Sequence, residues 1–233
     1  MKNRKKIVFL ASGNGGNLCF ISKAIEYGLL QNSEIVFVIC DRLCGAYTYA
    51  NKNFIPSKII LIDKNDQSQL ISILEKIAPD IIISNIHKIL NDDLVHKYQN
   101  KLINLHYSLL PAFSGLIGMN SVTQAINYGA KFLGVTVHYV AKEVDKGPPI
   151  SQIAFPYNQT KSDYDTKNLI FRLGCLCLLA SLEALVTNKL NTINAQTISN
   201  LTLGECTLSG AVLSEQALKL DESFWSSIKQ EVL

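Results

Sequence analysis

The sequence predicts an α/β protein with a Rossmann-like, mostly parallel twisted sheet and helices on both faces. Three observations favour this fold. Short apolar, β-branched runs alternate along the chain with segments whose apolar residues recur at helical spacing. One run, Asp80–Ser84, is apolar almost throughout, which is typical of a parallel strand covered on both sides. The 233 residues are 48% apolar and 18% charged, a composition that can bury a full core.

Strands and helices are predicted in alternation over the first 187 residues. Strands are expected at Lys6–Ala11, Glu34–Cys40, Lys58–Ile62, Asp80–Ser84, Lys101–His106, Lys131–Tyr139 and Ile150–Phe155. Helices are expected at Asn17–Tyr27, Gln67–Ile77, Asn91–Tyr98, Ser121–Tyr128 and Ser162–Thr187. Asn91 and Ser162 suit the N-cap position, because their side-chain oxygens can accept a backbone N–H from the first turn.

The regular pattern weakens after Asn188. We therefore expect one domain over residues 1–189 and an appendage over residues 190–233. Within the appendage, loose alternation predicts a small hairpin over 190–213, and apolar spacing predicts an amphipathic helix over 214–233. The appendage is expected to contribute packing and not chemistry.

Bulk properties exclude several classes of protein. A net charge of +3 is too small to indicate nucleic acid or an anionic membrane as a partner. The apolar run Ile7–Ala11 is too short for a signal peptide, and Leu173–Val186 reads as a buried helix shorter than the roughly 20 residues of a membrane span. The six cysteines form no paired CxxC motif, so no metal site is expected. A soluble cytoplasmic protein with reduced thiols is predicted.

A glycine-rich loop, Ser12–Asn17, joins the first predicted strand to the first helix. Its three glycines allow a tight turn with backbone N–H groups facing outward, next to the positive end of a helix. This arrangement predicts an anion site, most naturally for phosphate. The loop lacks the Gly-Lys-Ser/Thr of a Walker A motif and the third glycine of a dinucleotide fingerprint, so those two classes are not indicated.

Asn104, His106 and Asp145 supply an amide donor, an imidazole and a carboxylate. Asn104 and His106 end a strand, so alternation places their side chains on one side. Asp145 precedes a Gly147-Pro148-Pro149 turn that can swing it back toward them. Such a set can move a proton and stabilise an oxyanion at one carbon centre. Because ligands of parallel sheets bind beyond the carboxyl ends of strands, the Gly loop, Asn85–Leu90 and this group are expected to line one crevice.

Two long segments, Asn104–Pro111 and Gly134–Gly147, resemble the paired signatures of the folate-dependent formyltransferase family. The resemblance extends from about residue 6 to residue 187. Within that family, the opening Ser12–Leu18 is most similar to the branch that acts on glycinamide ribonucleotide in purine biosynthesis.

The resemblance implies the formyltransferase fold and transfer of a formyl group from 10-formyltetrahydrofolate, as co-substrate, to a primary amine. It implies catalytic roles for Asn104, a protonated His106 and Asp145, with His138 as a supporting residue that orders the site. It implies a folate pocket bordered by Ile86, His87, Lys88, Ile89, Leu90, Val140, Ala141, Lys142, Glu143 and Val144. Gly15, Gly16 and Asn17 would hold the phosphate of the acceptor.

Other functions stay open at this point. The segment 115–129 differs from the family pattern, and Cys177-Leu178 stands where a Glu-His pair is common, so the acceptor could be another amine such as a nucleotide-linked amino sugar. A formyltetrahydrofolate hydrolase would use water in place of the amine. A non-catalytic nucleotide-binding protein would use the Gly loop alone. The oligomeric state is not predicted.

Overall fold

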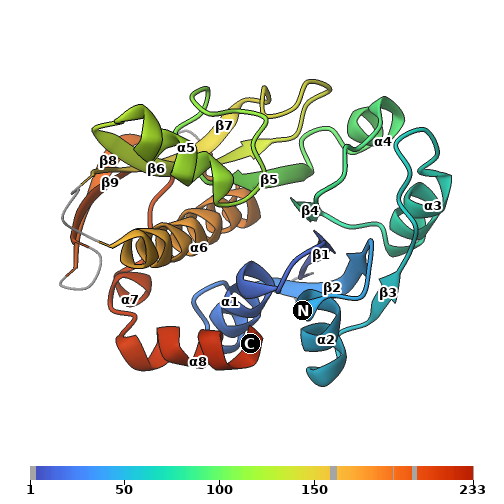
Figure 1. The fold of residues 1–233 in the computed structure, drawn as a ribbon. Coiled ribbons are helices and arrows are strands. Elements are labelled where there is room, and N and C mark those ends of the chain that lie inside the picture. Colours follow the sequence, from blue (N-terminus) through green and yellow to red (C-terminus); the bar gives the residue numbers. More distant parts are fainter. Residues whose placement is uncertain (1–3, 158–161, 191, 201–203, 233) are drawn as a thin grey trace. The chain divides into compact units, whose positions relative to one another are not determined.

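A computed structural model of the chain describes residues 4–157, 162–190, 192–200 and 204–232 (Figure 1). Its internal contacts divide it into two compact units. Unit 1 takes in the chain up to Asn104 and again from Leu220 onward, and unit 2 runs from Leu105 to Lys219.

The strands of unit 1 are parallel. They are β1 (Lys5–Ala11), β2 (Ser33–Cys40), β3 (Ser57–Ile59), β4 (Ile81–Asn85) and the start of β5 (Leu102–His106). Their order is β3-β2-β1-β4-β5, and every pairing between them is parallel. The two central strands, β1 and β4, are buried along most of their length, which follows from their continuous apolar sequences. The predicted mostly parallel α/β sheet is confirmed here.

Five helices belong to unit 1 within the described residues: α1 (Gly16–Glu26), α2 (Gly45–Lys52), α3 (Ser68–Ile77), α4 (Asp92–Lys97) and α8 (Glu222–Val232). Asn91 caps α4 as predicted, since its side chain accepts the Leu94 N–H at 3.0 Å. The helix α2 was not predicted.

The last helix packs on the first. Figure 1 shows α8 beside α1, and the Trp225 ring stacks on Phe20 with centroids 5.4 Å apart. Phe224 meets Phe20 and Tyr27 edge-on, at 5.9 and 5.5 Å. An aromatic cluster therefore joins the two ends of the sequence within unit 1.

Unit 2 is built on antiparallel pairing. Its strands β6 (Phe132–Tyr139), β7 (Pro149–Pro156), β8 (Thr192–Asn200) and β9 (Gly204–Gly210) follow the order β6-β7-β9-β8. Its helices are α5 (Asn120–Tyr128), α6 (Asp163–Thr187) and α7 (Glu215–Leu218). The predicted cap of α6 is confirmed, because Ser162 Oγ accepts the Asp165 N–H at 3.1 Å.

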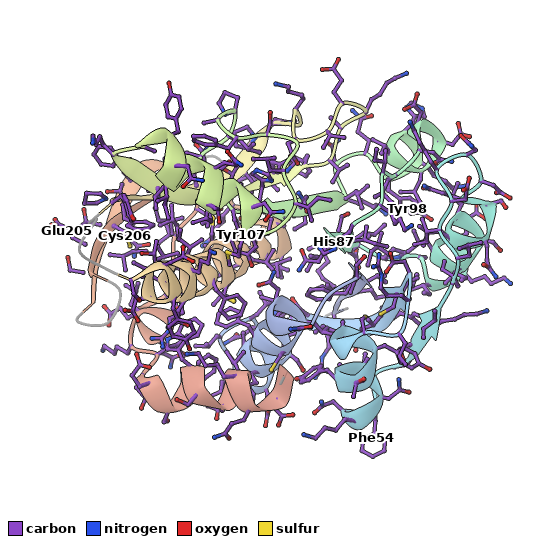
Figure 2. All side chains as sticks on the ribbon, viewed as in Figure 1. Phe54, His87, Tyr98, Tyr107, Glu205 and Cys206 are labelled. Carbon is purple, nitrogen blue, oxygen red and sulfur yellow. The ribbon has the colours of Figure 1, made fainter. Side chains whose placement is uncertain are left out.

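The helix α6 is the core element of unit 2 and packs on β6 and β7. By length and composition it could cross a membrane, but 78% of its most apolar 18 residues are buried inside the protein. The prediction of a buried helix is confirmed. Its Gly174 lies against the ring of Tyr107, which is labelled in Figure 2, and a Cβ there would come within 2.8 Å of Tyr107 Cε1.

Candidate active site

The carboxylate of Asp145 lies close to two imidazoles and a backbone N–H of unit 2. Its Oδ2 accepts the Gly115 N–H at 2.8 Å and lies 3.4 Å from His106 Nδ1. Its Oδ1 lies 3.6 Å from His138 Nε2. The Asp145 side chain is 8% exposed, and both imidazoles are buried. The structure thus brings His106, His138 and Asp145 together from three separate segments of the chain.

The turn that carries Asp145 depends on close backbone packing. The Tyr139 N–H donates to Pro148 O at 3.0 Å, which closes the loop after β6. Gly147 lies against the Tyr139 carbonyl so tightly that a Cβ would overlap it. Asp145 itself has φ 57°, in the left-handed region that aspartate tolerates better than most residues. The glycine and the turn after it return Asp145 to His106, as the sequence suggested, while its approach to Asn104 stays a prediction.

Both ring nitrogens of His106 have partners. Nε2 lies 3.0 Å from Phe113 O, and since a carbonyl can only accept, Nε2 carries the proton in that bond. Nδ1 faces Asp145. Burial is the largest influence on His106 and lowers its pKa below the usual 6.5, although Asp145 and the Phe113 carbonyl both act in the opposite direction. The neutral imidazole therefore predominates at pH 7, and added negative charge nearby would favour its protonation.

Asp145 stays ionised in spite of its burial. Desolvation opposes its charge, but hydrogen bonds from His138 and from the Gly115 N–H outweigh this and hold its pKa below 3.8. The site therefore keeps a fixed negative charge beside an imidazole whose charge can change.

The loop after β5 is held by three polar side chains that β6, β7 and the loop itself supply. Thr136 Oγ1 donates to Ser108 O at 2.7 Å and accepts the Leu110 N–H at 3.1 Å. Gln152 Nε2 donates to Leu110 O at 3.1 Å. Ser108 Oγ donates to Ala112 O at 2.5 Å. These bonds fix the segment whose Phe113 carbonyl holds His106.

Sequence reasoning did not identify Gln152 or Phe113 as supports of the site. Gln152 carried one usable signal, since it and Ser151 are polar residues within the mainly apolar stretch Ile150–Phe155. Phe113 acts through its backbone carbonyl, which side-chain chemistry cannot reveal.

The Gly loop of unit 1 forms a tight turn that leads into the N-terminus of α1. Gly15 has φ 87° and is the N-cap of α1, with no side-chain bond to the helix. A Cβ on Gly15 would lie 2.8 Å from Ala46 Cα, and one on Gly45 would lie 2.6 Å from Asn14 O. The first turn of α1 carries no acidic residue. The loop can accept an anion at the N–H groups of Gly16 and Asn17.

The predicted folate border in unit 1 is anchored by buried Gln67. The Gln67 amide donates to Ile89 O at 2.9 Å, and its oxygen accepts the Asn91 N–H at 3.0 Å. The loop also meets the Gly loop, because the His87 N–H donates to Ser12 Oγ at 2.8 Å. Ile89 is left 51% exposed, available to an apolar ring.

Two of the loops expected to share a crevice are thus joined. Lys88 belongs to the second of them, and its charge acts on Asp41 at the end of β2. Asp41 was not identified from the sequence, although the rule that ligands lie beyond strand ends applies to it as well.

The remaining predicted residues are divided between the two units. Asn104 is half-buried in β5 and is the last residue of unit 1. The segment Val140–Val144 follows β6 in unit 2, with Val144 51% exposed. The convergence of Asn104 and of both folate borders on Asp145 stays a prediction.

Cys177 and Leu178 lie deep in α6. Both are fully buried, and Cys177 Sγ lies 3.1 Å from Ser151 Oγ, which in turn lies 2.6 Å from Ser181 Oγ. Burial raises the pKa of Cys177 to about 12, so the thiol is not a nucleophile at neutral pH. These two side chains form part of the core of unit 2 and cannot bind a polar acceptor.

Comparison with known proteins agrees with this geometry. The family model described as "Formyl transferase" matches residues 5–173. The chain is 30% identical over 165 residues to phosphoribosylglycinamide formyltransferase of Bacillus subtilis, covering 66% of this chain and 81% of that protein. It is 29% identical over 160 residues to the chloroplastic phosphoribosylglycinamide formyltransferase of Arabidopsis thaliana, covering 65% of this chain and only 55% of that protein.

Among solved structures, the phosphoribosylglycinamide formyltransferase of Coxiella burnetii superposes with a TM-score of 0.74 at 30% identity. That match covers 87% of this chain and 95% of the other. The expected formyltransferase fold is confirmed, with the chain spanning about half the length of the plant relative. The motifs around Asn104–Pro111 and Gly134–Gly147 lie inside the matched region, and the chain belongs to the formyl transferase family.

Proposed function

We propose that this protein transfers the formyl group of 10-formyltetrahydrofolate to the primary amine of glycinamide ribonucleotide, a step of de novo purine biosynthesis. The observation that carries the proposal is the ionised Asp145 carboxylate beside His106. His106 is the last residue of β5, and Asn104 stands two residues earlier in the same strand. Membership of the family and the names of the relatives support the reaction and the acceptor.

The residues fit the two halves of a formyl transfer. When the amine nitrogen attacks the formyl carbon, the new C–N bond places negative charge on the formyl oxygen. The Asn104 amide can donate to that oxygen, and the added charge favours protonation of His106, which Asp145 stabilises. Collapse of the intermediate breaks the bond to the folate nitrogen, which takes up a proton that the amine has released.

The proposed binding surfaces suit the two substrates. The Gly loop, through Gly15, Gly16 and Asn17, offers backbone N–H groups to the acceptor's phosphate. Ile86–Leu90 and Val140–Val144 border the folate, and each leaves an apolar side chain exposed in its own unit. We place the enzyme in the cytoplasm, acting on small molecules without nucleic acid or a membrane.

The test is a formylation assay with purified protein, 10-formyltetrahydrofolate and glycinamide ribonucleotide. Asn104→Ala should lower kcat/KM by about 10²–10³, because it removes an oxyanion donor. Asn127→Ala removes the same amide from an exposed position of α5 and should leave turnover unchanged. Full activity of Asn104→Ala would refute its assigned role.

The same assay separates the alternatives. Formylation of an amino sugar nucleotide, with none of glycinamide ribonucleotide, would reassign the acceptor. Release of formate without any amine would indicate a hydrolase, and a protein that binds nucleotide but consumes no folate would not be an enzyme of this class.

A further inference from the structure

Unit 2 contains an apolar pocket that none of the proposed catalytic residues lines. It has a volume of about 400 Å³ and lies among the loop after β5, the helices α5 and α6, and the strand β6. This volume falls in the range of small-molecule sites, about 300–1,000 Å³. Its walls are mainly aromatic and aliphatic, and none of the described residues that line it carries a charge.

Aromatic residues form a substantial part of the walls. Tyr107, Phe113, Tyr128 and Phe132 all line the pocket. Tyr128 is 82% exposed and Phe132 60% exposed, so two large rings stand in solvent beside the opening. Phe113 and Tyr128 meet edge-on with centroids 5.9 Å apart. Rings in this arrangement favour a further planar ring, which can stack or meet them at an edge.

The Ser108 hydroxyl in the wall is already engaged. Ser108 Oγ donates to Ala112 O inside the loop, so it is not a free anchor for a ligand. A charged ligand would lose its hydration here without gaining an opposite charge. The chemistry of the pocket therefore selects an uncharged occupant.

One wall of the pocket is also a partner of His106. Phe113 lines the pocket, with its ring against that of Tyr128, while the Phe113 carbonyl accepts from His106 Nε2 at 3.0 Å. Phe113 has φ 57°, a left-handed conformation that is strained for a phenylalanine. A ligand that contacts this ring therefore acts on a residue with a strained backbone. The same backbone carries the carbonyl that bonds to His106.

We propose that this pocket is a second ligand site, which takes an uncharged molecule carrying a planar aromatic ring and reports its occupancy to His106 through Phe113. The inference rests on contacts within unit 2 and does not depend on the formyl-transfer reaction.

The probe for the test is indole, with indole-3-acetate as its charged counterpart. Binding is followed by calorimetry, and His106 by the NMR signal of its Cε1–H, assigned through its absence in His106→Gln. Indole should bind saturably and shift that signal, and indole-3-acetate should bind at least about tenfold more weakly.

Two variants fill the pocket from different sides. Ala130→Leu and Ala112→Leu each add bulk at a lining position that is at least partly exposed, so neither disturbs the core. Each should weaken indole at least about tenfold and abolish the His106 shift. Asn127→Leu adds a leucine to an exposed position of α5 outside the pocket and should bind indole like the parent protein.

Three results would overturn the proposal: no saturable binding of indole, equal binding by the filled variants, or binding that leaves the His106 signal unmoved. Equal affinity for indole-3-acetate would overturn the assigned ligand class. All of these readouts are independent of turnover, so a failure here is distinguishable from a failure of the proposed enzymatic activity.

Discussion

Asp145 and His106 influence each other's charge at a distance of 3.4 Å, and burial works against the ionisation of both. For Asp145 the hydrogen bonds prevail, and for His106 burial prevails. The different outcomes follow from the neighbours, because Gly115 and His138 both stabilise the charge of Asp145 while His106 has only one carboxylate beside it. The pair is therefore set as a carboxylate and a neutral imidazole, ready for one added proton.

Asp145→Asn should lower the pKa of His106 further, because it removes the charge that favours the imidazolium. The measurement is an NMR titration of His106 Cε1–H between about pH 4 and 8. Asp163→Asn, which removes an exposed carboxyl at the start of α6, is the matched control and should leave the titration unchanged. A rise in the pKa of His106 in Asp145→Asn would contradict this account.

The same pair gives stability a defined pH dependence. The pKa of His106 is lower in the folded chain than the unfolded value of 6.5, so its neutral form costs no stability above pH 6.5, and stability falls as pH drops through the window below it. Asp145 contributes stability above pH 3.8 that is lost as pH falls through its lower folded pKa. Both residues therefore lower the stability of the folded chain at acidic pH.

At the scale of elements, most strands and helices follow from the sequence because aliphatic periodicity marks them. The helix α2 was not predicted because its buried residues are Ala46, Tyr49 and Ala50, whose small or part-polar side chains give no aliphatic repeat. The stretch predicted as one helix over 214–233 contains two helices. Asp221 divides them, since its carboxylate accepts the Phe224 N–H at 2.9 Å and begins α8.

The site was predictable in its residue types and only partly in its supports. Side-chain chemistry pointed to His106 and Asp145, which the structure brings together. The groups that position them include the Phe113 carbonyl and the Gly115 N–H. Every residue has such backbone groups, so their use depends on the tertiary fold and leaves no mark in the sequence.

The glycine at position 174 of α6 is explained only by its contact with Tyr107. A glycine in a helix interior costs about 1 kcal/mol relative to alanine, yet here it leaves room for the Tyr107 ring. Gly174→Ala should destabilise the protein by about 1–3 kcal/mol, because the overpacking exceeds the gain in helix propensity. Urea denaturation measures the change.

A double-mutant cycle supplies the control for that prediction. In a Tyr107→Ala background the ring is gone, so Gly174→Ala should be neutral or stabilising by up to about 1 kcal/mol. The same destabilisation in both backgrounds would show that Tyr107 is not the residue that requires the glycine.

At the scale of the whole molecule, stability of unit 1 depends on the aromatic cluster between α1 and α8. Phe224→Ala should cost about 3–5 kcal/mol, because Phe224 is buried among three rings. Phe54→Ala is the matched control, since Phe54 belongs to the same unit and is 94% exposed (Figure 2). Phe54→Ala should change stability by less than about 0.5 kcal/mol in the same denaturation experiment. Equal losses in the two variants would rule out the cluster as the source.

The pairing of α8 with α1 also has a consequence for how the chain matures during synthesis. Ribosomes release about 5–20 residues per second, so Phe20 emerges many seconds before its stacking partner Trp225. In nascent chains stalled before residue 220, the part of α1 that α8 covers, around Phe20, should be open to protease and to chaperones, and its protection should begin only once Trp225 has left the exit tunnel. The earliest helix to be made would then be among the last to be sheltered.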